Sequence, residues 1–247
     1  MELVACVKLV YDETQISVDG GLNLEGVPVK ISEIDKNAVE EAVRIKEELG
    51  GRLTLVTVVT GPFDEAVLKE ALAMGADRAL IVRGDVEGHN PVRTALAIKK
   101  AIEEDGLKPD LILCGEGSSD YYSCSMAPLL GELMGLPSAS FVSRLELKDG
   151  KVLVERALEG GIEILELPLP AVISVTFEIN EPRIPTVLKI MRAGKKERKE
   201  VEFSGDYPRV KPLDMSPLVK ERRREKIEGS PEEVAKRLAQ IIREVLK

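Results

Sequence analysis

A glycine- and hydroxyl-rich segment is the part of this sequence best suited to bind a ligand. Residues 115–125 read Gly-Glu-Gly-Ser-Ser-Asp-Tyr-Tyr-Ser-Cys-Ser, between the apolar run Leu111–Cys114 and a predicted helix at Met126–Met134. Unpaired N–H groups at the start of such a helix suit a phosphate. A plain capped turn has a similar composition, but the position directly after a buried strand favours a ligand. Walker and G-x-G-x-x-G sequences, the commonest nucleotide fingerprints, are absent from the chain.

Several other polar residues have both a structural and a chemical interpretation. Asp12, at the mouth of the first predicted strand, and Asp35, before the first predicted helix, could bind ribose hydroxyls, although such residues more often cap helices. Tyr121 and Tyr122 could stack on a planar ring or cover the end of the sheet. His89 lies in a polar loop with no nucleophile beside it, which favours a surface role.

The cysteines do not form a recognisable reactive or metal-binding set. Cys6 and Cys114 fall within apolar runs, which is typical of inert buried thiols, and Cys124 has no neighbouring base. Three scattered cysteines and one histidine predict neither a disulfide framework nor a metal site. The sequence assembles no nucleophile with a base and an orienting group, so we predict no catalytic residues and leave open whether the chain is an enzyme by itself.

Composition and charge narrow the class of protein. With 44% hydrophobic and 32% charged residues, the chain can bury a full core and still present a solvated surface. The formal net charge of −8 argues against an overall basic nucleic-acid binder. No apolar run approaches the roughly 20 residues of a membrane helix. The run after Met1 also lacks the basic leader of a signal peptide, so we expect a cytoplasmic protein.

The elements that must position these residues alternate between strand and helix. Apolar runs predict buried parallel strands at Leu3–Val10, Leu53–Val59, Ala79–Val82 and Leu111–Cys114, and the segments between them show helical spacing. We therefore predict an α/β fold with a doubly wound, mostly parallel sheet. In such a sheet, ligands bind beyond the carboxyl ends of the strands.

The pattern changes after Pro137. Short, partly alternating runs predict antiparallel hairpin additions at Ser138–Leu147, Lys151–Ala157 and Ile162–Glu166, and a further strand is predicted at Ala171–Phe177. The two prolines of 180–185 then predict an exposed loop or crossing segment.

We divide the chain into a nucleotide-binding α/β domain at residues 1–194 and a charged arm that ends in an amphipathic helix at residues 195–247. Ser230 and Glu233 stand at the positions of a capping box, with Pro231 at the first helical position. The apolar face of this helix docks either on its own domain or on a partner subunit. Our prediction takes the partner subunit.

Several short segments resemble one family in both order and spacing. They are 154–156 (Val-Glu-Arg), 160–163 (Gly-Gly-Ile-Glu), 169–172 (Leu-Pro-Ala-Val), 180–183 (Asn-Glu-Pro-Arg) and 190–193 (Ile-Met-Arg-Ala), with 72–78 (Leu-Ala-Met-Gly-Ala-Asp-Arg) upstream. Together they look like the signature of electron transfer flavoprotein beta subunits, and the similarity covers roughly residues 1–200.

The resemblance implies a heterodimer in which an alpha subunit holds a redox-active FAD while the beta subunit binds FAD or, alternatively, AMP. It also implies electron transfer from a donor such as NADH or a dehydrogenase, with a dehydrogenase or a quinone-linked subunit as redox partner. Some members bifurcate electrons from NADH, and the run Gly20–Pro28 looks more like that group. We weigh this role against a non-redox regulatory module that binds an adenine nucleotide, which gives no role to Asn180–Ala193.

By position, the resemblance assigns nucleotide contacts to four parts of the chain. These are Cys6, Ser32, Glu33, Ile34, Asp35, Thr60, Gly115, Glu116, Gly117, Ser118, Ser119, Asp120, Tyr121, Tyr122, Ser123, Cys124, Ser125 and Met126. Val187 and Leu188 match the segment with which the family docks its redox partners. The family's loop often reads D-G-D-T-x-Q, whereas residues 120–125 here read Asp-Tyr-Tyr-Ser-Cys-Ser. Two rings therefore replace a glycine and an acid, and a serine replaces the glutamine.

Overall fold

The computed structural model describes residues 1–17, 22–86, 90–205 and 225–246. The chain divides into two compact units, Met1–Leu213 and Asp214–Lys247, and each is described by itself. His89 and the glycine pair at the start of the run Gly20–Pro28 lie outside the described residues. In the part of the chain that is described, no helix combines the length and apolar character needed to cross a membrane.

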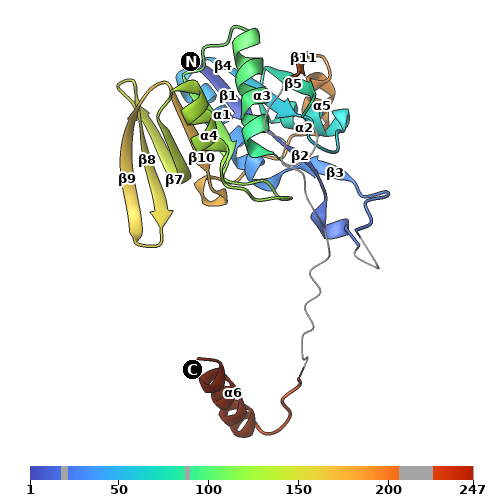
Figure 1. Cartoon of the computed structure of the whole chain (residues 1–247), viewed down its shortest axis with the longest axis vertical. Coiled ribbons are helices and arrows are strands. Elements are labelled where there is room, and N and C mark those ends of the chain that lie inside the picture. The colour runs from blue at the N-terminus through green and yellow to red at the C-terminus, as the bar shows by residue number, and fades with distance from the viewer. Residues whose placement is uncertain (18–21, 87–89, 206–224, 247) are drawn as a thin grey trace. The chain divides into compact units, whose positions relative to one another are not determined.

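The first unit is built on a nine-stranded sheet with the order β11-β5-β4-β1-β6-β10-β7-β8-β9 (Figure 1). Its parallel part confirms the predicted doubly wound α/β fold. The apolar runs form its centre because strands covered on both faces need apolar side chains on both sides. The parallel strands are β1 (Glu2–Cys6), β4 (Arg52–Val58), β5 (Arg78–Gly84), β6 (Leu111–Gly115), β10 (Ala171–Val175) and β11 (Glu197–Phe203).

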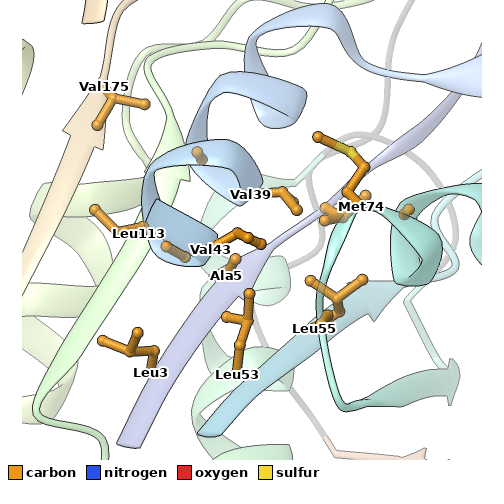
Figure 2. Close-up of a cluster of buried hydrophobic side chains, with 14 of the residues drawn as sticks. Leu3, Ala5, Val39, Val43, Leu53, Leu55, Met74, Leu113 and Val175 are labelled. Atoms are coloured by element: carbon orange, nitrogen blue, oxygen red, sulfur yellow. The ribbon is translucent and has the colours of Figure 1, made fainter. Parts of the chain in front are cut away.

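Helices cover both faces of the sheet. On one face lie α1 (Glu33–Leu49), α2 (Glu65–Met74) and α5 (Val187–Ala193), and on the other lie α3 (Pro91–Glu104) and α4 (Met126–Met134). Alternate residues of one strand serve the two cores: Leu3 packs toward α1 and Val4 toward α3. Figure 2 shows the first of these cores, where side chains of β1 and β4 meet those of α1.

The predicted hairpins are confirmed as β7 (Ser138–Lys148), β8 (Lys151–Leu158) and β9 (Gly161–Pro168). The first part of β7 pairs in parallel with β10, and its later part pairs antiparallel with β8, which joins the hairpins to the main sheet. The strand predicted at Ala171–Phe177 ends at Val175, and a 3-10 helix, η2 (Phe177–Ile179), comes after it.

Three short elements follow β1 in place of a continuous first strand. The apolar run Leu3–Val10 divides after Cys6, and β2 (Leu9–Tyr11) pairs antiparallel with β3 (Val29–Ile31) in a separate two-stranded sheet. Between them lies a 3-10 helix, η1 (Glu13–Gln15). Lys8 stands at the break between β1 and β2, with the buried Val7 and Leu9 on either side of it.

The expectation that an extended arm begins at residue 195 is wrong for residues 197–203. These residues form β11, which adds to the sheet beside β5 in parallel register. The segment looked like an arm because it is strongly charged, but Val201 and Phe203 alternate with charged residues and are buried. An edge strand needs only such a half-buried pattern.

The second unit contains α6 (Pro231–Val245). The predicted capping box is confirmed: the Ser230 side chain accepts from the backbone N–H of Glu233, and the Glu233 carboxylate accepts from the backbone N–H of Ser230. None of the residues of α6 is buried, so its apolar side chains, among them Leu238 and Ile242, face outward.

Candidate functional site

A pocket opens beyond the carboxyl ends of β1, β4 and β6. In the sheet, β4 and β5 lie on one side of β1 and β6 lies on the other, so the strand order reverses between β1 and β6. Open α/β sheets bind ligands at such a switch point. The lining residues are Cys6, Val7, Lys8, Asp35, Val56, Val58, Thr60, Pro91, Thr94, Ile98, Cys114, Gly115, Glu116, Gly117, Ser118, Ser123, Ser125 and Met126.

Asp35 joins the two strands that flank this switch point. Its carboxylate accepts from the backbone N–H of Lys8 at 2.8 Å, beyond β1, and from that of Gly115 at 3.2 Å, at the end of β6. Burial raises the pKa of Asp35 to about 7, although both N–H donors act to lower it. A Cβ atom at residue 115 would lie 2.6 Å from the Asp35 carboxylate, so this approach requires glycine.

The expectation that Asp35 caps the first helix is therefore wrong, because Ser32 occupies the N-cap position of α1. Asp12 does act as a cap: its carboxylate accepts from the backbone N–H of Thr14 at 3.1 Å, at the start of η1. Hydrogen bonds from Thr14 and Gln15 lower the pKa of Asp12 to about 2. Asp12 does not line the pocket, whereas Asp35 does.

The two buried thiols at the pocket wall are chemically quiet. Burial, and in second place the Asp35 carboxyl, raises the pKa of Cys6 to about 12. Burial also raises the pKa of Cys114 well above its usual value. Because the thiolate is the reactive form, the interpretation as inert buried thiols holds for both. In the described residues, no group of three or more metal-ligating side chains lies together.

The N-terminus of α4 faces the pocket without a side-chain cap. Asp64 and Asn90 cap α2 and α3 through their side chains, whereas Ser32, at α1, and Ser125, at α4, make no such bond. Ser125 and Met126 line the pocket, so the first turn of α4 presents its N–H groups there. Such a turn, with the dipole of the helix behind it, favours an anion.

The loop before α4 is tied to the start of α1. The backbone N–H of Ser119 donates to Ser32 Oγ at 3.2 Å, and the backbone N–H of Glu33 donates to Ser119 Oγ at 3.3 Å. Lys8 Nζ lies 2.6 Å from Asp120 Oδ2 and 5.2 Å from the centre of the Tyr121 ring. Residues far apart in the sequence are thus fixed around one opening.

The comparisons with known proteins give the family of this chain. The family model described as the electron transfer flavoprotein domain matches residues 20–205. The electron transfer flavoprotein subunit beta of Thermoanaerobacterium thermosaccharolyticum is 36% identical over 211 residues, which span 83% of this chain and 80% of the relative.

The chain belongs to the electron transfer flavoprotein beta-subunit family.

Measured against the family's usual loop, the two tyrosines of this member have distinct positions. The Tyr122 hydroxyl donates to the buried Glu116 carboxylate, and this hydrogen bond raises the pKa of Tyr122 to about 12. A Cβ atom at Gly117 would lie 2.9 Å from the Tyr122 ring, so the ring fills the space of a side chain at 117. Tyr121 and Tyr122 are both 51% exposed at the rim.

Of the nucleotide contacts expected for this family member, ten line the pocket and eight do not. Those in the lining are Cys6, Asp35, Thr60, Gly115, Glu116, Gly117, Ser118, Ser123, Ser125 and Met126. Those outside the lining are Ser32, Glu33, Ile34, Ser119, Asp120, Tyr121, Tyr122 and Cys124. Four of these, Ser32, Glu33, Ser119 and Asp120, tie the loop to α1 and to Lys8.

Sequence reasoning missed several lining residues, including Lys8, Pro91 and Thr94. The sequence pattern could have predicted Lys8, because a lysine that interrupts an apolar strand run near its carboxyl end lies where ligands bind in this fold. Pro91 and Thr94 begin α3 and reach the pocket through the topology of the sheet, which no local pattern reveals.

The segment expected to dock redox partners is exposed in this family member. Val187 and Leu188 lie on α5 and are 75% and 56% exposed. Ile184 and Met191 lie beside them in the sequence, at 92% and 70% exposure. Ala193 is the buried residue of this helix.

Proposed function

We propose that this chain is the nucleotide-binding subunit of a heterodimeric electron transfer flavoprotein and that its pocket holds FAD, with AMP as the alternative. The partner is an alpha subunit whose own FAD carries electrons between a donor and an acceptor. The observation that supports nucleotide binding most strongly is the uncapped N-terminus of α4, which faces the pocket at the switch point of the sheet.

The lining residues fit the adenosine phosphate portion that FAD and AMP share. The N–H groups at the start of α4 and the hydroxyls of Ser123 and Ser125 suit phosphate oxygens. Val56, Val58 and Ile98 supply an apolar wall for a planar ring. A bound FAD would supply one- and two-electron redox chemistry, while the protein holds and orients it.

Electrons would enter from NADH or a dehydrogenase and leave to a redox partner, a dehydrogenase or a quinone-linked subunit. We place the docking of such a partner at Val187 and Leu188. Their exposure supports this, because exposed apolar side chains that lie together mark interaction sites. Bifurcation of electrons from NADH requires FAD in this pocket in addition to the FAD of the alpha subunit.

We further propose that α6 docks on the alpha subunit. Its capping box helps the helix to form, and none of its residues is buried within the described part of its own unit. Leu238 and Ile242 are each 48% exposed, and Val245 is 79% exposed. An amphipathic helix of this kind buries its apolar face on a partner surface.

The nucleotide content of the purified heterodimer tests the central proposal. The chain is co-expressed with its alpha subunit, the complex is denatured, and the released FAD and AMP are quantified for each heterodimer. Two FAD support bifurcation, and one FAD with one AMP supports an electron carrier that does not bifurcate. A complex that releases no nucleotide beyond the FAD of the alpha subunit contradicts nucleotide binding in this pocket.

A matched pair of serine variants assigns the nucleotide to this pocket. Ser123→Ala removes a hydroxyl from the lining, and we expect roughly tenfold weaker nucleotide retention because a hydrogen bond to a charged group is lost. Ser143→Ala removes a hydroxyl that donates to Glu155 O at 3.4 Å on β7, outside the pocket, and should leave retention unchanged. Equal retention in both variants would place the nucleotide elsewhere.

The role of α6 is tested with charges on its two faces. Leu238→Asp with Ile242→Asp should weaken the heterodimer, because it puts carboxylates on the apolar face. Gln240→Asp puts one carboxylate on the opposite face and serves as the control for added charge. Dissociation of the heterodimer, measured by analytical ultracentrifugation, should increase only for the first variant.

A further inference from the structure

The segment that leads from the sheet to α5 is fastened to α1 by side chains. Between η2 and α5, residues 180–186 have no regular secondary structure. Asn37 Nδ2 nevertheless donates to the carbonyl oxygens of Phe177 at 3.3 Å and Asn180 at 2.8 Å. In return, Asn180 Nδ2 donates to the carbonyl oxygen of Asn37 at 3.0 Å and to Glu41 Oε2 at 2.9 Å. This exchange fixes the start of the segment.

Arg183 fastens the same segment farther along α1. Its backbone N–H and its Nε donate to Glu40 Oε2 at 3.1 Å and 2.7 Å, and its Nη2 donates to Glu40 Oε1 at 3.1 Å. Its Nη1 and Nη2 also donate to the two oxygens of the Glu47 carboxylate, at 2.6 Å and 2.9 Å. One guanidinium therefore makes bidentate pairs with two carboxylates of one helix.

The first of these pairs is buried on its acidic side. Glu40 is 3% exposed, and its carboxylate also accepts from Arg44 Nε at 2.8 Å. Burial acts to raise the pKa of Glu40, but the hydrogen bonds from Arg183 and Arg44 bring it below its ordinary value. Leaving a buried carboxylate without such a partner strongly destabilises a protein, so the Glu40 carboxylate fixes the position of Arg183.

The helix α5, which begins four residues after Arg183, buries little of its own surface. It has seven residues, too few to be stable as an isolated helix in water, and Ala193 is its buried residue. Four apolar side chains nevertheless stand outward here: Ile184, Val187, Leu188 and Met191. Lys189, Arg192 and Lys195 are exposed on the same stretch.

We propose that Arg183, together with Asn180, is a positioning residue that presets this apolar surface for a redox partner whose apolar groove carries an acidic rim. The inference rests on the proposed function, because it takes α5 as the docking element. Holding the surface in its bound conformation lowers the ordering cost of association. The exposed basic residues favour a partner of opposite charge and make docking sensitive to salt.

The test compares three arginine variants of the full chain in its heterodimer. Arg183→Gln removes the charge, Arg183→Lys keeps it without the bidentate geometry, and Arg83→Gln breaks a surface pair with Glu200 as the control. Amide hydrogen exchange of residues 184–194 should become about tenfold faster in Arg183→Gln, partly faster in Arg183→Lys and unchanged in Arg83→Gln. Exchange of Leu111–Gly115 should stay slow in all three, which reports an intact sheet.

The functional measurement uses a purified flavin dehydrogenase that reduces the complex. Arg183→Gln should raise the KM for this dehydrogenase about tenfold and leave kcat near the wild-type value, because docking and not electron transfer is impaired. Raising the salt concentration should raise the KM of both proteins, because the exposed basic residues of this stretch are the same in the variant. A variant that merely unfolded the chain would lower kcat and speed exchange throughout. In that case Glu47→Gln is used instead, because it removes only the more exposed of the two ion pairs of Arg183, those with Glu40 and Glu47, which together we call the Arg183 clamp.

The experiments distinguish a failure of the positioning role of the Arg183 clamp from a failure of the docking role of α5. If Leu188→Asp raises the KM but Arg183→Gln alters neither KM nor exchange, the positioning role is overturned and docking at α5 stands. If neither variant raises the KM, α5 is not the docking element and this part of the proposed function is overturned. The nucleotide count of the heterodimer is unaffected by both outcomes.

Discussion

Two neighbouring strands send two very different loops from the same edge of the sheet. β6 and β10 pair in parallel, so the segments after Gly115 and after Val175 both leave at their carboxyl ends. The first turns its polar groups inward, where Ser118 and Ser123 line the pocket. The second crosses α1 and turns Val187 outward. The position in the fold is shared, so the side chains decide which loop lines the pocket and which exposes apolar residues.

Helix α1 is common to both loops. At its start, Asp35 and Ser32 hold the pocket loop, and farther along Glu40 and Glu47 hold the outward segment. Of these two loops, the first contributes N–H groups and hydroxyls to a pocket, and the second exposes apolar side chains together. Changes in the loop after Gly115 should therefore affect nucleotide retention, and changes in the segment after Val175 should affect docking of a redox partner.

The largest effect should come from a charge on the outward loop. Leu188→Asp places a carboxylate on the exposed apolar surface, and we expect docking of a redox partner to weaken by about 2–4 kcal/mol, the range of interface hot spots. Leu49→Asp puts the same charge on another half-exposed leucine, at the end of α1, and is the control. Nucleotide retention should not change in either variant, and a loss of nucleotide from Leu188→Asp would remove the distinction between the loops.

On the pocket loop, the sharpest change is a single methyl group. Gly115→Ala puts a Cβ atom 2.6 Å from the Asp35 carboxylate. We expect a loss of about 1–3 kcal/mol in the free energy of unfolding, as for other overpacked sites, and weaker nucleotide retention because β6 shifts at the pocket. Urea denaturation measures the first effect, and nucleotide release measures the second.

Gly160→Ala is the matched control for this change. No atom lies within 4 Å of a Cβ built at Gly160, so the same methyl group meets open space. Its effect on unfolding should stay within about 0.5 kcal/mol. Similar losses in the two variants would mean that the contact between Gly115 and Asp35 does not govern the pocket.

Local patterns predicted a large share of this fold. The helix Met126–Met134 and the capping box of α6 were both predicted and are confirmed, because a helix start, an apolar run and a cap are set by residues close in sequence. β11 was missed since its charged residues qualify as a strand only when paired with β5. No pattern near Glu40 announces Arg183, which lies 143 positions later in the chain.

The same reasoning explains the candidate site. The glycine- and serine-rich loop was found because its composition is local, whereas Lys8 and Thr94 come to the pocket through the order of the strands. Asp35 was assigned to the right region but given a cap as its structural role. Its two N–H donors, at residues 8 and 115, meet only when β1 and β6 lie side by side.

A further, pH-dependent effect should follow from Asp35. Because its pKa rises from 3.8 to about 7 on folding, the native state binds a proton that the unfolded state has lost between these values. The contribution of this group to stability is therefore largest in acid, falls as the pH rises from about 4 to 7, and is constant above 7. Asp35→Asn removes the titration.

Urea denaturation of both proteins between pH 4 and pH 8 measures this linkage. The free energy of unfolding of the wild type minus that of Asp35→Asn should fall steadily up to about pH 7 and then level off, given the pKa of about 7. A difference that grows with pH would show that the carboxylate is stabilised in its charged form by the two N–H donors. In that case the link between β1 and β6 would be ionic at neutral pH.

The smallest effect concerns the rim of the pocket loop. Tyr122→Phe keeps the ring that fills the space beside Gly117 but removes the donor to the buried Glu116 carboxylate. We expect a loss of about 1 kcal/mol in stability, the low end of the range for an unsatisfied buried acceptor, because water reaches the half-exposed rim. Release of nucleotide should become modestly faster.

The tyrosine titration identifies this hydrogen bond directly. With its pKa raised to about 12, Tyr122 should ionise late in an ultraviolet titration of the wild type, and that late phase should vanish in Tyr122→Phe. Tyr11→Phe, on β2 and outside the pocket lining, should leave the late phase in place. If the late phase persists in Tyr122→Phe, Glu116 is not held by this ring. The conformation of residues 115–125 would then depend only on their hydrogen bonds to α1 and their ion pair with Lys8. The two loops would then differ in how they are held to α1 as well as in their residue types.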